Sequence, residues 1–197
     1  MKQSLFTRYS RGQIAIFLKA LDRRISNRID LLVVGGAACS LGYNSNTKTN
    51  DIDVYRVIRG DTSALGHAAH EARDESGYGV AIGSATIADL PYDFETRIRQ
   101  VSNLGLSNIR IFVPDKYDIS LSKICRGYSH DLEAVLGIHR RHKLSQKVLL
   151  DRFEKEFLHI ANTNKRMLCI SMFLAVSQLY GRIEGERFAS KYEISLP

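Results

Sequence analysis

Two aspartates one residue apart follow a glycine pair near the start of the chain, and their spacing restricts the chemistry that they can do. Gly35 and Gly36 end an apolar run, a polar loop follows, and Asp51 and Asp53 open the alternating stretch DIDVYRVI. Alternate residues of a strand point to the same face, so the two carboxylates should project together. Carboxylates this close repel each other unless a cation lies between them. The pair is therefore a candidate site for Mg²⁺ (or Mn²⁺), which proteins bind through one or two carboxylates together with substrate phosphates.

The glycine pair that precedes the aspartates is the other part of this pattern. Where a strand runs into a helix, backbone N–H groups are exposed and the helix N-terminus favours an anion. A phosphate-binding turn beside a metal-binding carboxylate pair is the equipment of phosphoryl or nucleotidyl transfer. Either feature alone also occurs in ordinary turns and solvated strand edges, and it is their order within residues 35–53 that favours function. The P-loop pattern GxxxxGK[ST] and the dinucleotide-binding pattern GxGxxG are both absent.

The elements that must position these residues can be predicted from the periodicity of apolar residues. Helical spacing predicts helices, and alternation or short apolar runs bounded by turns predict strands. In the first part of the chain the expected helices cover residues 11–29, 37–42 and 63–76. The expected strands cover residues 31–34 and 51–58, a short stretch within 80–90, and residues 108–114.

From residue 115 onward the sequence predicts helices only. Asp115 can cap a helix through ISLSKICR, Gly127 can end it in the left-handed conformation, and Ser129 can cap the next helix, HDLEAVLGIHRRH. Two further helices are expected near residues 145–161 and 164–181, and the tail after them has no clear pattern. The whole chain therefore predicts an α/β fold of the α+β kind, with a small mixed sheet flanked by helices and a helical C-terminal part.

The composition indicates a folded protein with an excess of positive charge. The 197 residues are 44% hydrophobic and 25% charged, which suits one globular domain or one domain with a helical extension. The net charge of +7 favours polyanionic partners such as nucleic acid or nucleoside triphosphates. No apolar run approaches the roughly 20 residues that cross a bilayer, and the first residues do not form a secretory signal. With three scattered cysteines, Cys39, Cys125 and Cys169, and no CxxC pair, we expect a cytoplasmic protein with reduced thiols.

The stretch VVGGAACSLGYNSNTKTNDIDVY resembles the signature of the polymerase-β nucleotidyltransferase superfamily. That signature consists, in this order, of a strand, a Gly-Gly or Gly-Ser turn, a helix, a loop with a basic residue and a threonine, and Asp-x-Asp on a strand. Further on, PDKYDISLSKICRGYSHDLEAVLGI is similar to the second half of the AbiEii-type branch, which contains bacterial toxins. The resemblance covers roughly residues 29–140. It implies a nucleotidyltransferase domain over residues 1–143, with residues 144–197 as a helical C-terminal extension packed on it.

By position, the resemblance also implies a set of site residues. The implied catalytic residues are Asp51, Asp53, Lys123 and Asp131, of which the first two hold the metal. The implied nucleotide-binding residues are Gly35, Gly36, Lys48, Thr49 and Arg126. Three of these charges also have a structural explanation. Lys123 and Arg126 lie near the end of one expected helix and Asp131 near the start of the next, where cations and an acid offset the helix dipoles.

The third carboxylate that many superfamily members carry on a later strand has no certain counterpart here. Asp93 and Glu95, in the stretch PYDFETR, are candidates. Otherwise Asp131 completes the site, or a second metal ion is held weakly. The basic run HRRHK at residues 139–143 is either a solvated helix end or a grip on an RNA backbone. His67 and His70 have helical spacing without a third ligand, so we predict no metal site there.

Three functions of different class fit these features. The first is a Mg²⁺-dependent nucleotidyltransferase that moves a nucleoside monophosphate from an NTP to a hydroxyl. For it, the branch resemblance implies the 3′ end of tRNA or a protein as acceptor, and a role as the toxin of a toxin–antitoxin or phage-defence system with a cognate antitoxin. The second is a binding module of the same fold that holds RNA or nucleotide without chemistry. The third is a small-molecule nucleotidyltransferase of the antibiotic-modifying kind, which the basic charge disfavours.

Overall fold

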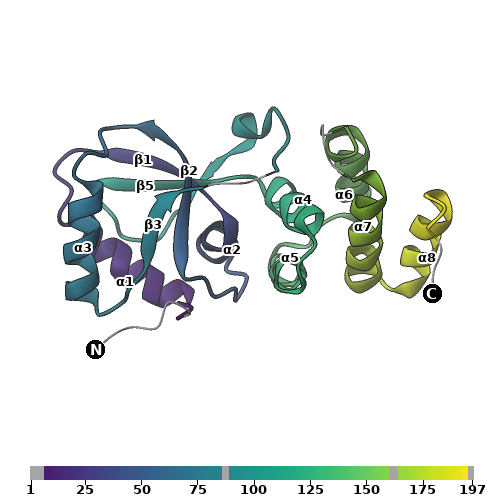
Figure 1. The fold of residues 1–197 in the computed structure, drawn as a ribbon, viewed down its shortest axis with the longest axis horizontal. Helices are drawn as coiled ribbons and strands as arrows, with labels where there is room; N and C mark the ends of the chain where they lie inside the picture. Colours follow the sequence, from purple (N-terminus) through teal and green to yellow (C-terminus); the bar gives the residue numbers. More distant parts are fainter. Residues whose placement is uncertain (1–6, 86–88, 160–163, 195–197) are drawn as a thin grey trace.

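A small mixed sheet forms the centre of the N-terminal half in the computed structural model, which describes residues 7–85, 89–159 and 164–194 (Figure 1). Its strands are β1 (Ile29–Val34), β2 (Asp51–Arg59), β3 (Ala81–Ser84), β4 (Arg99–Gln100) and β5 (Ile109–Val113), in the order β3-β2-β1-β5-β4. The middle strand β1 pairs antiparallel with β2 and parallel with β5. At the edges, β3 runs parallel to β2 and β4 runs antiparallel to β5. Every residue of β1 is buried, as expected for the central strand of a covered sheet.

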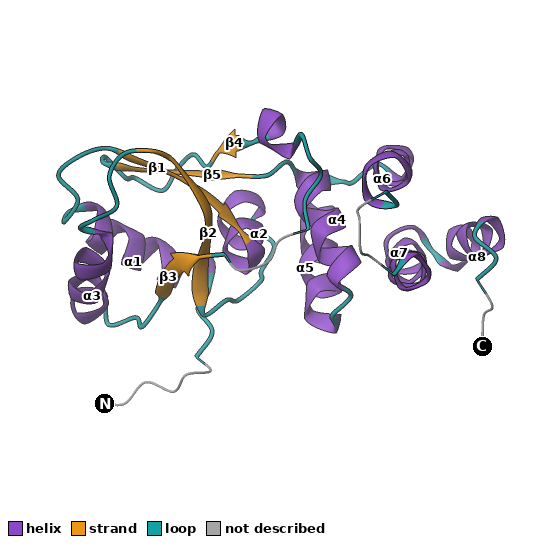
Figure 2. Cartoon of the chain, turned by 45° about the horizontal axis from the view of Figure 1, so that its top comes forward, coloured by secondary structure: helices purple, strands orange, loops and turns teal. Residues whose placement is uncertain are grey.

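Helices cover the sheet and then continue away from it. The helices α1 (Arg11–Asp22), α2 (Gly35–Tyr43) and α3 (Leu65–Ser76) lie on one side of the sheet (Figure 2). The C-terminal part contains α4 (Lys116–Arg126), α5 (Ser129–His142), α6 (Gln146–Arg152), α7 (Lys165–Tyr180) and α8 (Arg182–Lys191). A short 3-10 helix, η1 (Phe94–Arg97), precedes β4, and a π-helical turn, η2 (Phe153–Phe157), continues α6. The molecule is elongated, with the sheet and the N-terminus at one end and α8 at the other (Figure 1). None of the described helices is long and apolar enough to cross a membrane.

The α+β fold, the main strands and several helix boundaries confirm the expectations from sequence. The Asp115 carboxylate caps α4 by accepting a hydrogen bond from the backbone N–H of Tyr117 at 2.9 Å. Gly127 ends the same helix with a φ of +76°, in the left-handed region that favours glycine. Cys39 is fully buried, and burial raises the pKa of its thiol to about 11, so the thiol stays protonated.

Other boundaries differ from the expectations, and each difference has a local cause. The helix expected over residues 11–29 ends at Asp22, and Ile29 instead begins β1. The Asp22 carboxylate accepts three backbone hydrogen bonds, from residues 107–109, which ties the helix end to the start of β5. Ser129 is the first residue of α5 and not its N-cap, because Tyr128 occupies the cap position. The two-residue strand β4 is too short for its periodicity to be recognised, and the unassigned tail forms α8.

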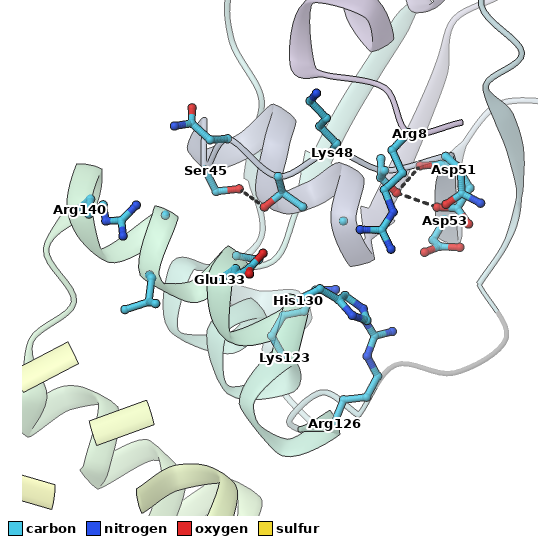
Figure 3. A pocket seen from close by; sticks show the side chains of 18 residues that line it. Arg8, Ser45, Lys48, Asp51, Asp53, Lys123, Arg126, His130, Glu133 and Arg140 are labelled. Atoms are coloured by element: carbon cyan, nitrogen blue, oxygen red, sulfur yellow. Dashed lines mark hydrogen bonds between the residues drawn. The ribbon is translucent and has the colours of Figure 1, made fainter. Parts of the chain in front are cut away.

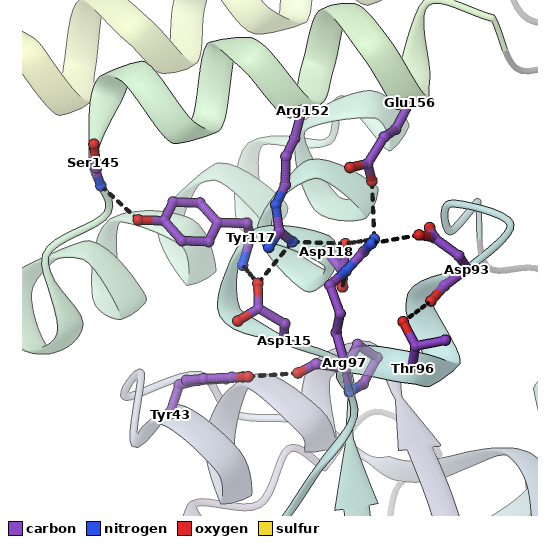
Figure 4. Close-up of polar contacts among 11 residues, drawn as sticks. Tyr43, Asp93, Thr96, Arg97, Asp115, Tyr117, Asp118, Ser145, Arg152 and Glu156 are labelled. Atoms are coloured by element: carbon purple, nitrogen blue, oxygen red, sulfur yellow. Dashed lines mark hydrogen bonds and ion pairs between the residues drawn. The ribbon is translucent and has the colours of Figure 1, made fainter.

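The C-terminal helices are joined to the rest of the chain by apolar packing and by a buried polar network. The buried apolar side chains of the described residues form one cluster that runs from Tyr9 to Phe188. Beside it, Asp118 on α4 is fully buried and accepts hydrogen bonds from Arg97 at 2.8 and 3.0 Å and from Arg152 at 3.2 Å (Figure 4). Arg97 also pairs with Glu156 at 2.9 Å. The network therefore connects η1, α4 and the α6–η2 segment.

Candidate active site

A cavity of about 710 Å³ opens between the start of β2, the loop at residues 45–50 and one face of α5 (Figure 3). Seven of the nine expected site residues line it: Gly36, Lys48, Thr49, Asp51, Asp53, Lys123 and Arg126. Gly35 lines a smaller adjoining pocket of about 70 Å³, and Asp131 lines neither. The fold thus brings together residues from α2, the loop, β2 and α4 that are up to 90 positions apart in the sequence.

The carboxylate pair is placed by the alternation of β2. Asp51 and Asp53 are half-buried on the cavity side, while Ile52 and Val54 between and after them are buried. The Asp51 carboxylate accepts a hydrogen bond from the Thr49 hydroxyl at 2.8 Å. Burial, and then the neighbouring charge of Asp51, raise the pKa of Asp53, although the positive charges of two nearby side chains oppose the shift. Lys123 and Arg126 therefore offset the effects of burial and of Asp51 only in part.

The glycine pair has a steric role on top of any role in phosphate binding. Gly35 has a φ of +68°, and a Cβ at this position would collide with the carboxylate of Asp53. A Cβ on Gly36 would lie 2.9 Å from the hydroxyl oxygen of Thr49, which is too close for an ordinary contact. The first turn of α2 can therefore approach both Asp53 and Thr49 only because two glycines stand there. This approach places the N-terminus of α2, the end that favours anions, beside the carboxylates.

Lys123 and Arg126 share one buried partner at the end of α4. Asp131 is fully buried in the first turn of α5 and accepts hydrogen bonds from the Lys123 ammonium at 2.8 Å and from two Arg126 nitrogens at 2.6 Å. Burial alone would raise the pKa of Asp131, but the hydrogen bonds and charges of the two cations lower it below its ordinary value. Lys123 is only 5% exposed and still lines both pockets. Asp131 therefore lies behind the two cations and holds them at the edge of the cavity.

The two candidates for a third carboxylate lie outside the cavity. Asp93 pairs with Arg97 at 2.9 Å, and Glu95 pairs with Arg56 at 2.7 Å. Asp89, which sequence reasoning missed, lines the small pocket together with Asp53 and Gly35. Its place after β3, the strand parallel to β2, is the signal that could have identified it. Among the described residues, no group of three or more His, Cys, Asp or Glu side chains could hold a metal ion by itself.

The face of α5 that lines the cavity was also not expected from the sequence. His130, Glu133, Gly137 and Arg140 follow one another at spacings of three or four residues, and all line the cavity. A Cβ on Gly137 would collide with the backbone carbonyl of Ser45, so this glycine lets the loop pack directly on the helix. In Figure 3, Arg140 lies at the opposite end of the cavity from the carboxylate pair. Of the basic run at residues 139–143, Arg140 is the one residue that lines the cavity.

Arg8 supplies a further cavity residue from the N-terminal segment. The neighbouring Tyr9 pairs with Thr49 through two backbone hydrogen bonds, of 2.7 and 3.1 Å, which fixes this segment beside the loop. Figure 3 shows the Arg8 side chain extending into the cavity from the side of Asp51 and Lys48. No sequence signal pointed to this residue, because a two-residue bridge has no periodicity.

Comparison with known proteins identifies a family for the chain. Residues 13–175 match the family described as nucleotidyltransferase of unknown function (DUF6036), and the chain belongs to that family. The match supports the nucleotidyltransferase superfamily inferred from the glycine pair and the Asp-x-Asp motif. The mixed sheet flanked by helices is consistent with the nucleotidyltransferase type of fold. No curated protein and no solved structure matches the chain.

Proposed function

We propose that the protein is a Mg²⁺-dependent nucleotidyltransferase that moves a nucleoside monophosphate from an NTP to a hydroxyl acceptor and releases pyrophosphate. The observation that carries the proposal is the meeting of Asp51, Asp53, Lys123 and the N-terminus of α2 at one cavity. The family match supports the reaction class, and an NTP is the substrate that this class uses.

The donor set fits a hard divalent cation. Asp51 and Asp53 would hold Mg²⁺ (or Mn²⁺), because both carboxylates face the cavity and a cation would offset the burial and the charge of Asp51 that raise the pKa of Asp53. When bound, the ion supplies neutralisation of phosphate charge and a lower pKa of the acceptor hydroxyl. Asp89 stands near enough to Asp53 to line the same small pocket and is the best-placed carboxylate for a supporting role.

The protein's own groups account for the rest of the chemistry. The backbone N–H groups at the start of α2 and the Lys48 side chain would hold the triphosphate. Lys123 and Arg126 would stabilise the charge that develops on the phosphoryl oxygens, because Asp131 keeps both cations fixed in advance. Asp131 itself acts as a positioning residue in this scheme, since it is fully buried behind them.

The acceptor and the biological role are proposed from the resemblance of residues 115–140 to the AbiEii-type branch. The acceptor would be the 3′ end of tRNA or a protein hydroxyl. The protein would act in the cytoplasm as the toxin of a toxin–antitoxin or phage-defence system, with a cognate antitoxin as a partner. A second candidate function, a nucleotide- or RNA-binding module with little catalysis, is favoured by the presence of two rather than three grouped carboxylates among the described residues.

The decisive experiment is to incubate the protein with each labelled NTP, Mg²⁺ and either total bacterial RNA or a cell lysate. We expect label on an RNA or protein band with the wild type and none with the Asp51→Asn, Asp53→Asn double variant. The Asp93→Asn variant, whose carboxylate lies outside the cavity, is the matched control and should label as the wild type does. Label on no band with any NTP would favour the binding module.

A further inference from the structure

Two stacked aromatic rings stand at the start of α5, beside the cavity. The rings of Tyr128 and His130 are 5.5 Å apart between centroids and only 9° from parallel. Tyr128 is 59% exposed and the His130 side chain 48% exposed. His130 lines the cavity, whereas Tyr128 lies outside it. The pair therefore runs from the cavity to the solvent, and its exposure means that packing in the core does not explain it.

Both cations and carboxylates lie near this aromatic pair, and His130 is 3.7 Å from the carboxylate of Asp131. The Arg126 guanidinium carbon lies 5.6 Å from the centre of the Tyr128 ring, and Arg126 also lines the cavity. Further along the same face of α5, Arg140 lies about 15 Å from His130, at a rise of about 1.5 Å per residue. Arg8, Lys48 and Arg140 line the cavity, and none of them forms an ion pair with another residue in the described part of the chain. With a divalent cation on Asp51 and Asp53, as proposed above, and Lys48 on the triphosphate, Arg8 and Arg140 outnumber Glu133, so the cavity keeps a positive excess that suits a polyanion.

We propose that Tyr128 and His130 form a stacking platform for nucleobases of a single-stranded RNA acceptor. This inference rests on the proposed nucleotidyl transfer at the same cavity. Stacking on an aromatic ring suits any base, and the neighbouring cations suit the sugar-phosphate backbone. A ligand that stacks on both rings reaches from the cavity into solvent, so it is longer than one NTP. A protein acceptor would need neither parallel exposed rings nor the surplus of cations.

The test is a set of variants measured by three readouts. The variants are Tyr128→Ala, His130→Ala and their combination, with Tyr128→Phe and His130→Phe as versions that keep the rings. Tyr92→Ala removes a fully exposed tyrosine that does not line the cavity and is the matched control. The readouts are the affinity for a labelled single-stranded oligoribonucleotide by fluorescence anisotropy, the NTP affinity by calorimetry, and the unfolding midpoint.

We expect each alanine variant to weaken oligoribonucleotide binding by about five- to 150-fold, the range typical for loss of one stacked base. The phenylalanine variants and Tyr92→Ala should stay within about twofold of the wild type, because they keep the stacking surface. In Tyr128→Ala, whose side chain lies outside the cavity, the NTP affinity and the midpoint should not change. Competition by a duplex RNA of the same length should be weak, since paired bases cannot stack on the platform.

Several results would overturn the platform. They are an unchanged oligoribonucleotide affinity in the double alanine variant, a loss of NTP affinity instead of RNA affinity, or no RNA binding by the wild type together with label on a protein. Failure of the proposed nucleotidyl transfer would give a different result from failure of the platform. If no NTP is transferred but RNA binding depends on both rings, the platform stands and the binding module is the correct function.

Discussion

Asp53 is the carboxylate of the candidate site whose surroundings oppose its ionisation. It is half-buried on β2, it faces Asp51, and Gly35 packs against its carboxylate. Burial and the charge of Asp51 raise its pKa, so ionising this carboxyl group costs more in the folded protein than in water. A divalent cation, as proposed above, would offset both effects.

The first prediction concerns the carboxylates of Asp51 and Asp53. Replacing Asp51 or Asp53 by Asn keeps the shape and removes metal-binding charge, so transfer should be abolished while the fold persists. In the wild type, Mg²⁺ with an NTP should raise the melting temperature, and in either variant this rise should disappear. Melting curves of the metal-free proteins serve as the control, in which the variants should melt at or above the wild-type temperature. Wild-type transfer rates in both variants would remove the pair from the site.

A pH dependence follows from the raised pKa of Asp53. Between the ordinary pKa of an aspartate and the raised value, the folded protein binds more protons than the unfolded one, so stability falls as the pH rises. The metal-free wild type should therefore lose stability relative to Asp53→Asn as the pH increases through this window. Urea unfolding of both proteins across the acidic range measures the difference. A difference that is constant with pH would mean that Asp53 has an ordinary pKa.

Lys123 separates an enzyme from a binding module. If it stabilises charge that grows only during transfer, Lys123→Ala should lower the single-turnover rate about a hundredfold and change the NTP affinity little. Because Lys123 is 5% exposed and bonded to Asp131, a stability loss of about 1–3 kcal/mol is also expected, which exceeds the effect of a helix dipole alone. The transfer rate should be measured well below the unfolding midpoint. A lowered midpoint with unaltered transfer would make Lys123 structural and would weaken the AbiEii-type assignment.

The first turn of α2 lies close to the loop at residues 45–50, because Gly36 leaves room for the side chain of Thr49. Gly36→Val should weaken NTP binding steeply, because the added side chain would displace Thr49 and stand between the helix amides and the triphosphate. Gly66→Ala on α3 is the matched control, since a Cβ there meets nothing within 4 Å. That change should be neutral or stabilise the protein by up to about 1 kcal/mol. Unchanged NTP binding in a folded Gly36→Val protein, measured by calorimetry, would show that the glycine serves only the turn.

The network around Asp118 connects the helical C-terminal part of the molecule to η1, the 3-10 helix that precedes the edge strand β4. We propose that residues 144–197 depend on it to pack on residues 1–143. Arg97→Ala leaves the fully buried Asp118 with Arg152 alone and should destabilise the protein by about 3–5 kcal/mol. Arg182→Ala, which breaks an exposed pair with Glu186, should cost at most about 0.5 kcal/mol. Urea unfolding of the two variants tests this, and equal midpoints would exclude a stabilising role for the network.

Features that depend on neighbouring residues could be predicted from the sequence. The alternation of β2 predicted that Asp51 and Asp53 share a face, and the cap at Asp115 and the left-handed Gly127 marked the ends of α4. The order of glycine pair, loop and Asp-x-Asp indicated the superfamily that the family match supports. These features are short-range, because backbone periodicity and turn chemistry act within a few residues.

Which distant groups meet depends on the packing of the folded chain. Asp131 carries the right residue type for a metal ligand, and packing of α5 on α4 instead buries it behind Lys123 and Arg126. Asp93 and Glu95 have the right residue type as well, but each pairs with an arginine away from the cavity. The cavity face of α5 and the placing of Arg8 depend on segments far apart in the chain. Such contacts are set by burial and charge pairing across the folded molecule, for which no local pattern in the sequence exists.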